Sequence, residues 1–403
     1  MAEGTNQPVT AERGAAKRPE RILVVDDIED NRQLLIRRLT REGFGAIATA
    51  ADGEEALALI DSEPFDLVLL DVMMPKCDGY QVLERLKAAG KLHQLPVIVI
   101  SALNEIDSVV RCIQLGAVDY LPKPFNATLL RARVGASLEQ KQLRDQVQAH
   151  LTRLEDELEA ARNLQMSMVP TDFPAPTPER PVEIFAMMEP AREVGGDLYD
   201  FFPTEDGRLA FAIGDVSGKG VPAAMFMART KNLLRVVSGF MLQDGAAAGP
   251  GEILGRVNAE LCDGNSTLMF VTLYLGLLDP KSGVVRFANA GHDAPYRLGP
   301  QGVVSATGAQ GMALGIDPRW RYETAELKLA PGEALFLYTD GITEANDPAL
   351  ALFARERLEA ALKAAPGAPL ESLVRAVGAA VGKFAAGAPQ ADDITALAVR
   401  LKG

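Results

Sequence analysis

Short apolar runs that alternate with amphipathic stretches constrain the fold of the first third of the chain. The runs are ILVV (22–25), DLVLL (66–70), PVIVI (96–100) and DYL (119–121). Continuous apolar strands of this kind are typical of a parallel sheet that is buried on both faces. The stretches between them, such as residues 29–42 and 79–89, have the pattern of helices. This alternation predicts a doubly wound α/β sheet, with a fifth strand through residues 46–49.

Polar residues stand where these strands end. Asp26 and Asp27 follow the first strand, and Asp71 follows the third. The carboxyl ends of neighbouring parallel strands share one crevice, in which ligands bind. Three carboxylates would repel each other there unless a hard cation such as Mg²⁺ lay between them. Ser101 and Lys123 come from two further strand ends, and a hydroxyl with an ammonium can hold phosphoryl oxygens. A lone strand-end aspartate is usually only a solubilising residue. Three aspartates together with a serine and a lysine at the strand ends instead indicate a phosphoryl site.

The motifs at these positions resemble those of the bacterial response-regulator receiver domain. They are VVDD (24–27), LLDVMMPKCDG (69–79), ISA (100–102) and DYLPKPF (119–125). The resemblance implies a flavodoxin-like receiver over residues 20–136, after a disordered tail at residues 1–19. It also implies that a histidine kinase phosphorylates Asp71.

By the same resemblance, two groups of residues serve the phosphorylated aspartate. A magnesium ion is implied at Asp26, Asp27, Asp71 and the backbone carbonyl of Met73. The switch residues that report phosphorylation are implied to be Ser101, Tyr120 and Lys123.

Residues 137–169 contain no glycine or proline and are rich in helix-forming residues. Apolar residues recur in alternating steps of four and three, with one interruption at Gln165: Val147, Leu151, Leu154, Leu158, Ala161 and Met168. This spacing is typical of a coiled coil and predicts a homodimer through the helix. The alternative is a long helix packed on a neighbouring domain. A proline-rich stretch at residues 170–181 is expected to end the helix.

The remaining residues, 170–403, mix longer strands with helices. Strands are expected at LAFAIGDV (209–216), MFVTLYLGLLD (269–279), VVRFANAG (284–291), EALFLYTD (333–340) and ITALAVRL (394–401). Helices are expected at residues 223–237, 250–262 and 370–384. Consecutive strands, with a hairpin at DPKSG (279–283), predict an α+β sandwich flanked by helices.

A second set of aspartates lies at the ends of these strands: Asp197, Asp200, Asp215, Asp340, Asp392 and Asp393. Carboxylates drawn from separate strands favour a two-metal site with oxygen ligands, which can activate water against a phosphoryl ester. The three histidines are far apart, so Mg²⁺ or Mn²⁺ is expected rather than zinc. The alternatives are a structural Ca²⁺ cluster or ordinary strand-end acids.

The motifs around these acids resemble the PPM-type metal-dependent Ser/Thr phosphatases, in particular their SpoIIE-like branch. They are VGGDLYDF (194–201), GDVSGKG (214–220), NAGHDAPY (289–296), LYTDGITEA (337–345) and ADDITALAV (391–399). The resemblance implies that two Mn²⁺ or Mg²⁺ ions are held by Asp197, Asp215, the carbonyl of Val216, Asp340 and Asp393. Asp215 is the implied bridging ligand.

Three positions near these motifs need separate interpretation. Asp200 is a less certain ligand, and its role stays open. Ser217 stands where eukaryotic-type members of the superfamily have a histidine that acts as a general acid, so water is expected to protonate the leaving group here. His292 is as readily a hydrogen-bonded structural residue as a catalytic one.

The two resemblances together imply a response regulator whose output is phosphoprotein dephosphorylation, controlled at Asp71. The implied substrate is a Ser/Thr-phosphorylated anti-sigma-factor antagonist of the STAS type. The sequence does not say whether phosphorylation activates or inhibits. One rival is a binding module that only sequesters a phosphoprotein. Another is a diguanylate cyclase, since GGDLY (195–199) is similar to a cyclase signature, but the later motifs have no place in that fold.

Composition excludes further classes of function. Acidic residues outnumber basic ones by 54 to 41, giving a net charge of −13, which disfavours nucleic acid as a partner and a DNA-binding output. No apolar run reaches the roughly 18 residues that span a bilayer, so no membrane contact is expected. The three cysteines lie far apart and predict no disulfide framework, which fits a cytoplasmic protein.

Overall fold

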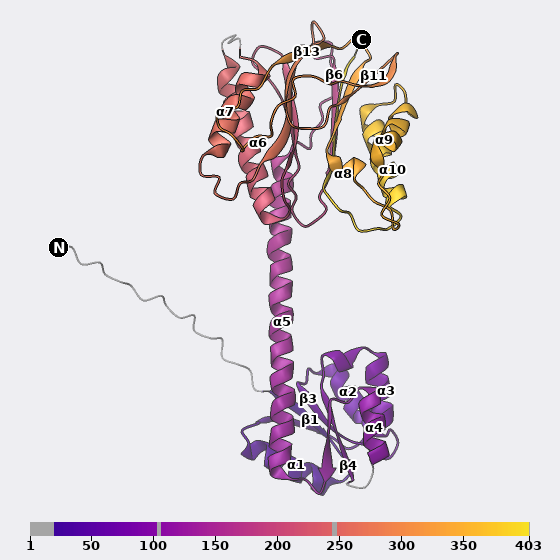
Figure 1. Cartoon of the computed structure of the whole chain (residues 1–403). Helices are drawn as coiled ribbons and strands as arrows, with labels where there is room; N and C mark the ends of the chain where they lie inside the picture. Colours follow the sequence, from indigo (N-terminus) through magenta and orange to yellow (C-terminus); the bar gives the residue numbers. More distant parts are fainter. Residues whose placement is uncertain (1–19, 103–105, 244–247, 403) are drawn as a thin grey trace, which may run out of the picture. The chain divides into compact units, whose positions relative to one another are not determined.

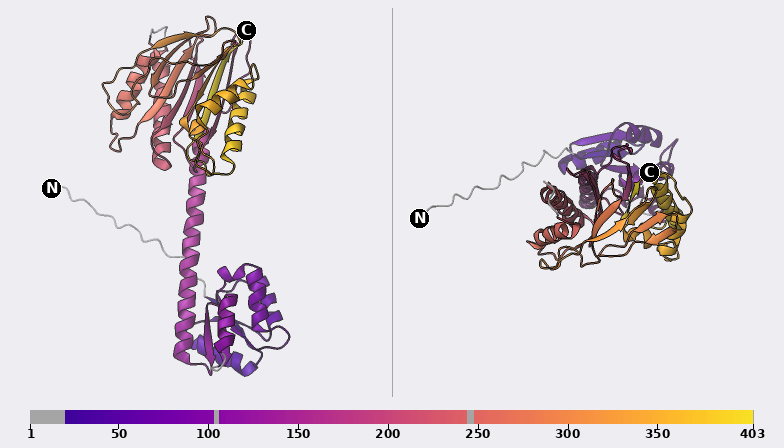
Figure 2. Two further views of the ribbon diagram at one scale, coloured as in Figure 1. Left: turned by 45° about the vertical axis from the view of Figure 1, so that its right-hand side comes forward. Right: turned by 90° about the horizontal axis from the view of Figure 1, so that it is seen from above.

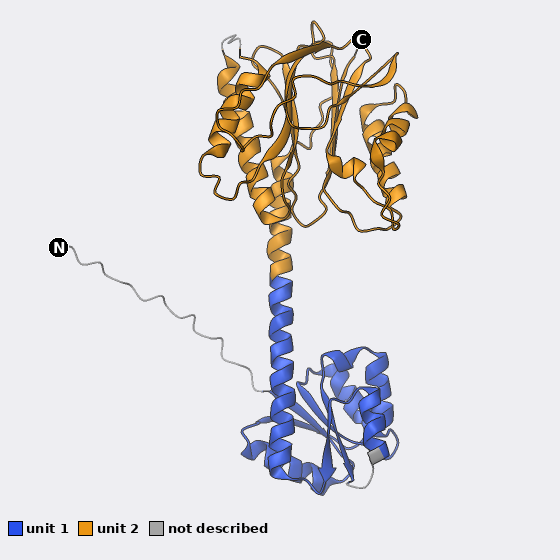
Figure 3. Cartoon of the chain, in the orientation of Figure 1, with its two compact units in different colours: residues 1–153 blue, residues 154–403 orange. Residues whose placement is uncertain are grey.

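The computed structural model describes residues 20–102, 106–243 and 248–402, so the tail expected at residues 1–19 lies outside the described part. The chain divides into two compact units, residues 1–153 and 154–403 (Figure 3). Among the described residues, no helix combines the length and the apolar character that a membrane span requires.

The first unit is a five-stranded parallel sheet with strand order β2-β1-β3-β4-β5 (Figure 1). Its strands are β1 (Arg21–Val25), β2 (Ala46–Ala50), β3 (Leu67–Asp71), β4 (Val97–Ala102) and β5 (Asp119–Lys123). Its helices are α1 (Glu29–Arg41), α2 (Gly53–Ser62), α3 (Gly79–Ala88) and α4 (Ile106–Leu115), with a short 3₁₀ turn η1 (Lys91–His93). The strand order and the predicted doubly wound α/β fold are those of flavodoxin-like domains, so the prediction is confirmed.

Strand β1 shows why the first apolar run is continuous. Leu23 and Val25 pack into a core on one side of the sheet, whereas Ile22 and Val24 pack into a second core on the other side. Because successive side chains of a strand point to opposite faces, a strand covered on both faces must be apolar at every position.

Helix α5 (Ala127–Met168) begins within the segment that the sequence assigned to the receiver and continues past the boundary between the two units. Its first turns bury Leu130, Val134 and Leu138 against the receiver core. The spacing of these residues by four places them on one face, so the last receiver helix and the linker helix form one element. The predicted helix is therefore confirmed, with an earlier start.

The second unit contains two five-stranded sheets. One has the order β13-β10-β9-β8-β7 and the other β12-β11-β14-β15-β6. The strands of the first are β7 (Leu198–Pro203), β8 (Leu209–Val216), β9 (Val271–Leu278), β10 (Val284–Ala290) and β13 (Ala325–Lys328). Those of the second are β6 (Val182–Glu189), β11 (Tyr296–Gly299), β12 (Gly302–Ser305), β14 (Ala334–Tyr338) and β15 (Ile394–Leu401). The hairpin predicted at residues 279–283 joins β9 to β10.

The two sheets face each other and carry helices on their outer faces (Figure 2). Phe211 and Tyr274 from one sheet share a buried core with Leu335 and Leu397 from the other. The outer core of the first sheet includes residues of α6 (Val221–Met241) and α7 (Pro250–Cys262). That of the second includes residues of α9 (Ala354–Lys363) and α10 (Leu370–Ala385). The predicted α+β sandwich flanked by helices is confirmed.

Candidate functional sites

Three carboxylates meet at the carboxyl edge of the receiver sheet, as the sequence predicted. Asp26, Asp27 and Asp71 each offer an oxygen atom within 4.8 Å of the others. Nζ of Lys123 lies 2.9 Å from Oδ2 of Asp26 and 2.7 Å from Oδ2 of Asp71. Burial raises the pKa of Asp71 to about 6, although the lysine works in the opposite direction. A cluster of hard oxygen ligands that repel each other fits a divalent cation such as Mg²⁺.

The remaining predicted receiver residues lie on β4, on β5 and just after β3. Ser101 is buried on β4, next to Asp71 on the neighbouring strand β3 in the sheet order. Tyr120 on β5 is 38% exposed, and Arg133 of α5 lies over its ring. The backbone N–H of Met73 donates a hydrogen bond to Asp71. The roles of these residues in metal binding and switching stay predictions.

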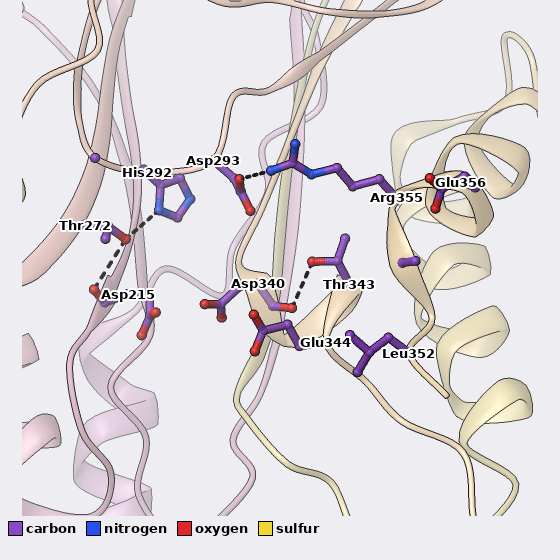
Figure 4. Close-up of a pocket in the computed structure, with 12 residues that line it drawn as sticks. Asp215, Thr272, His292, Asp293, Asp340, Thr343, Glu344, Leu352, Arg355 and Glu356 are labelled. Carbon is purple, nitrogen blue, oxygen red and sulfur yellow. Dashed lines mark hydrogen bonds and ion pairs between the residues drawn. The ribbon is translucent and has the colours of Figure 1, made fainter. Parts of the chain in front are cut away.

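The second unit brings Asp215, at the end of β8, and Asp340, at the start of α8 (Asp340–Thr343), into one cavity of about 550 Å³. Figure 4 shows the two carboxylates approaching from separate elements. Burial and neighbouring acids raise the pKa of Asp215 to about 7 and that of Asp340 to about 6. Burial and the charge of Asp215 raise the pKa of Asp197 well above its ordinary value. Burial is the largest cause of each shift and the crowding of the acids adds to it, and such acids could hold divalent cations.

The acids of this second site are less tightly grouped than those of the receiver. Within the described residues, only the receiver acids bring three ligand atoms within 4.8 Å of one another. Carboxylate ligands suit Mg²⁺ or Mn²⁺, so these acids could still hold such ions.

Asp393 fixes the loop that carries Asp197. Its Oδ1 accepts a hydrogen bond from the backbone N–H of Ala191 (2.8 Å), and its Oδ2 accepts one from that of Gly196 (2.6 Å). Asp197, in turn, accepts a hydrogen bond from the hydroxyl of Thr339 (2.8 Å). Asp393 therefore orients the loop in this conformation, and its predicted role as a metal ligand stays a proposal.

Asp392 is a further candidate, which the sequence analysis placed in the second set of acids but not among the implied ligands. Its charge raises the pKa of both Asp215 and Asp340, and its carboxylate pairs with Lys219 at 2.9 Å. Both acids act on the pKa of Asp215, but Asp392 pairs with Lys219 whereas Asp393 accepts hydrogen bonds from the backbone of the 191–197 loop. Sequence alone gives no signal that separates two neighbouring aspartates before the same strand.

Asp200, whose role was open, has a structural role. It is fully buried on β7 and pairs with two cations of helix α6. Nζ of Lys231 lies 3.2 Å from Oδ2 of Asp200, and Nε of Arg235 lies 2.9 Å from the same atom. A carboxylate that is held by two cations fastens α6 to the sheet and is poorly placed to bind a metal.

His292 lines the same cavity as Asp215 and Asp340, and hydrogen bonds hold it in place. Nδ1 lies 2.9 Å from the hydroxyl of Thr272, and its backbone N–H donates to the side chain of Asn289 (2.7 Å). Burial lowers the pKa of His292 to about 4, so the ring is neutral near pH 7. A neutral imidazole is a poor proton donor.

Ser217 does not replace the general acid of the wider superfamily. Its hydroxyl accepts a hydrogen bond from the backbone N–H of Phe270 at 3.0 Å. A serine hydroxyl is also far too weak an acid for this step at neutral pH.

Two family models match the chain. The response regulator receiver domain matches residues 22–135, and the Stage II sporulation protein E (SpoIIE) family matches residues 205–402. The SiaA-PP2C domain of Pseudomonas aeruginosa has a similar structure, with a TM-score of 0.54 and 25% identity. That likeness covers 62% of this chain and 98% of the other.

Curated relatives match one or both units. Protein IcfG of Synechocystis sp. is 35% identical over 271 residues, which is 60% of this chain and 41% of the relative. The transcriptional regulatory protein CpxR of Escherichia coli is 47% identical over 129 residues, which is 32% of this chain and 53% of the relative. The chain thus spans about half the length, or less, of these curated relatives.

Proposed function

We propose that this chain, which joins a response regulator receiver domain to a SpoIIE-type PPM phosphatase domain, is a response regulator whose output is dephosphorylation of a Ser/Thr phosphoprotein. The observation that carries the proposal is the cavity that contains both Asp215 and Asp340. Their pKa values are raised to about 7 and about 6 because the carboxylates are buried beside other acids. A divalent cation bound there would stabilise their ionised forms.

Residues of the chain would hold two Mn²⁺ or Mg²⁺ ions in the second unit. The proposed ligands are Asp197, Asp215, the carbonyl of Val216, Asp340 and one or both acids of the Asp392–Asp393 pair. When bound, such ions supply a water nucleophile at neutral pH and balance the charge of the phosphoryl group. Asp393 and Thr339 keep Asp197 in place through their hydrogen bonds.

Arg355 is the proposed contact for the phosphorylated substrate. The residues that line the cavity include several acids and the cation Arg355, whose Nη2 lies 2.6 Å from Oδ1 of Asp293 (Figure 4). Its side chain is 64% exposed, so the guanidinium can donate further hydrogen bonds to a ligand. Arginine suits phosphate oxygens because its N–H groups form a planar fork.

The proposed kinase and substrate rest on the likeness to the two families. A histidine kinase would phosphorylate Asp71, with Mg²⁺ held by Asp26, Asp27 and the carbonyl of Met73. The substrate would be a phosphorylated STAS-type anti-sigma-factor antagonist, as the SpoIIE-like resemblance implies. Control would pass along α5, and its exposed apolar seam would join two copies of the chain.

The test is hydrolysis of p-nitrophenyl phosphate and of a phosphoserine STAS protein by the full chain with Mn²⁺. Activity that is lost with EDTA and in Asp215→Ala supports the phosphatase. Tight binding of the phosphorylated STAS protein without any hydrolysis would favour the binding module and contradict the enzyme.

A further inference from the structure

Gln165 is a buried polar residue in the last turns of α5, at the position that interrupts the apolar seam. Its side chain is 4% exposed. Nε2 donates a hydrogen bond to the carbonyl of Gly195 (2.6 Å), and Oε1 accepts one from the N–H of the same residue (3.1 Å). A buried carboxamide is costly unless both its ends are satisfied, so this pair of bonds fixes Gly195 relative to the helix.

Gly195 leads directly into the acids of the second site. The next two backbone N–H groups, of Gly196 and Asp197, lie 2.6 Å and 3.3 Å from Oδ2 of Asp393. A Cβ atom on Gly195 would lie 2.3 Å from that same oxygen, so this backbone packs closely against the carboxylate. A shift of Gly195 therefore moves Asp197, Asp393 or both.

A second contact joins the same helix end to the same loop. Nη1 of Arg162, one turn before Gln165, lies 3.4 Å from the carbonyl of Arg192. Both contacts lie within the second unit, and both belong to the helix that begins at Ala127 in the first.

We propose that Gln165 is a positioning residue of the second metal site and the point at which a change in α5 reaches the metal ligands. This inference rests on the proposed function, since it concerns the metals and the control of that same site. A rotation or a shift of α5 at this level alters the two hydrogen bonds to Gly195. The loop then changes the distance between Asp197 and the cavity acids, and with it the affinity for metal.

The experiment uses the full chain with Gln165→Met, which keeps the length of the side chain but removes both hydrogen bonds. Gln148→Met is the matched control, because Gln148 is exposed on the same helix. Calorimetry measures Mn²⁺ binding, and Asp215→Ala identifies the part of the signal that belongs to the second site. We expect Mn²⁺ binding there to weaken about tenfold in Gln165→Met, as for other residues that orient metal ligands, and to be unchanged in the control.

The same variants are then treated with a small phosphodonor that loads Asp71. We expect the activity of the wild-type chain and of the control to change, and that of Gln165→Met to respond much less at saturating Mn²⁺. If Gln165→Met does not fold, the same measurements are made on Gln165→Glu. This variant keeps the acceptor for the N–H of Gly195 but loses the donor to the carbonyl of Gly195.

Two results separate failure of this inference from failure of the proposed function. A wild-type chain that hydrolyses neither substrate contradicts the phosphatase, whereas Mn²⁺ binding still reports on Gln165. A Gln165→Met protein with a lower melting temperature but wild-type Mn²⁺ affinity and phosphodonor response would show a merely structural role and overturn the inference.

Discussion

At the scale of single residues, Asp215 combines a cost to stability with a proposed role in metal binding. Burial, Asp340 and the Asp392–Asp393 pair raise its pKa to about 7, so in the metal-free protein the ionised form is unfavourable. Asparagine has the same shape and no charge. We expect Asp215→Asn to lower phosphatase activity by at least about two orders of magnitude.

The same substitution should not lower the melting temperature of the metal-free protein, and should raise it near pH 8, because a repelled charge is removed. Differential scanning fluorimetry with EDTA measures this. A variant that loses activity only because it unfolds would contradict the assignment of Asp215 to the metals.

Asp200 should give the opposite result. Asp200→Asn leaves the buried Lys231 without its carboxylate, which costs about 3 kcal/mol. We expect a clear fall in melting temperature, with an unchanged Mn²⁺ concentration for half-maximal activity in the folded fraction. A large rise in that Mn²⁺ concentration would mean that Asp200 is a ligand.

Arg355 is tested with Arg355→Gln, and Arg256→Gln serves as the control, since Arg256 is an exposed arginine on α7 that does not line the cavity of Asp215 and Asp340. If Arg355 contacts the phosphoryl group, the KM for p-nitrophenyl phosphate rises several-fold, and kcat changes less. An effect on a phosphoprotein alone would instead place the contact beside the phosphorylated residue. Steady-state kinetics with both substrates distinguishes these outcomes.

At the scale of elements, the strands that are buried on both faces were predictable, and short, exposed strands were not. The sequences of β1 and β3 predict strands because their residues are almost all apolar, and nearly every one of them is buried in the fold. Strand β2 is only partly buried but was expected at residues 46–49, whereas β12 is largely exposed, has no strong apolar pattern and was not predicted. Edge strands owe their place to hydrogen bonds with a neighbour, which single-sequence patterns do not reveal.

The site was predictable to a similar degree and for a similar reason. Asp215 and Asp340 follow buried strands, so their convergence could be inferred. Asp200 could not be separated from Asp197 because its partners, Lys231 and Arg235, come from a helix distant in the sequence. Gln165 could be recognised as a break in the seam, but its partner Gly195 could not.

The predicted dimer is tested on helix α5 itself. Val147, Leu151 and Leu154 are 59%, 48% and 55% exposed, which leaves an apolar seam for a second copy. We expect Val147→Asp with Leu154→Asp to weaken self-association at least about 100-fold, because buried charges would replace apolar contacts. Analytical ultracentrifugation measures the change, and Gln148→Asp is the control. A dimer that survives the double substitution would place the interface elsewhere.

At the scale of the whole molecule, the acids should link stability to pH and metal. The pKa values of Asp215 and Asp340 are raised from 3.8 to about 7 and about 6. Between about pH 4 and 7, these two acids hold more protons in the folded metal-free protein than in the unfolded chain, so their contribution to stability falls as pH rises. We expect Mn²⁺ to raise the melting temperature little near pH 5 and strongly near pH 8. Equal stabilisation at both values would contradict the proposed ligands.

The central claim is that phosphorylation of the receiver controls a metal-dependent phosphatase in the same chain. The most direct measurement is the rate of dephosphorylation of a phosphoserine STAS protein at saturating Mn²⁺, with and without a small phosphodonor. The wild-type chain and Asp71→Asn are compared, since asparagine keeps the shape of the acceptor without its reactivity. The account predicts a rate that changes several-fold with the phosphodonor in the wild-type chain and not in Asp71→Asn. An active chain with the same rate in all four conditions would contradict control by the receiver.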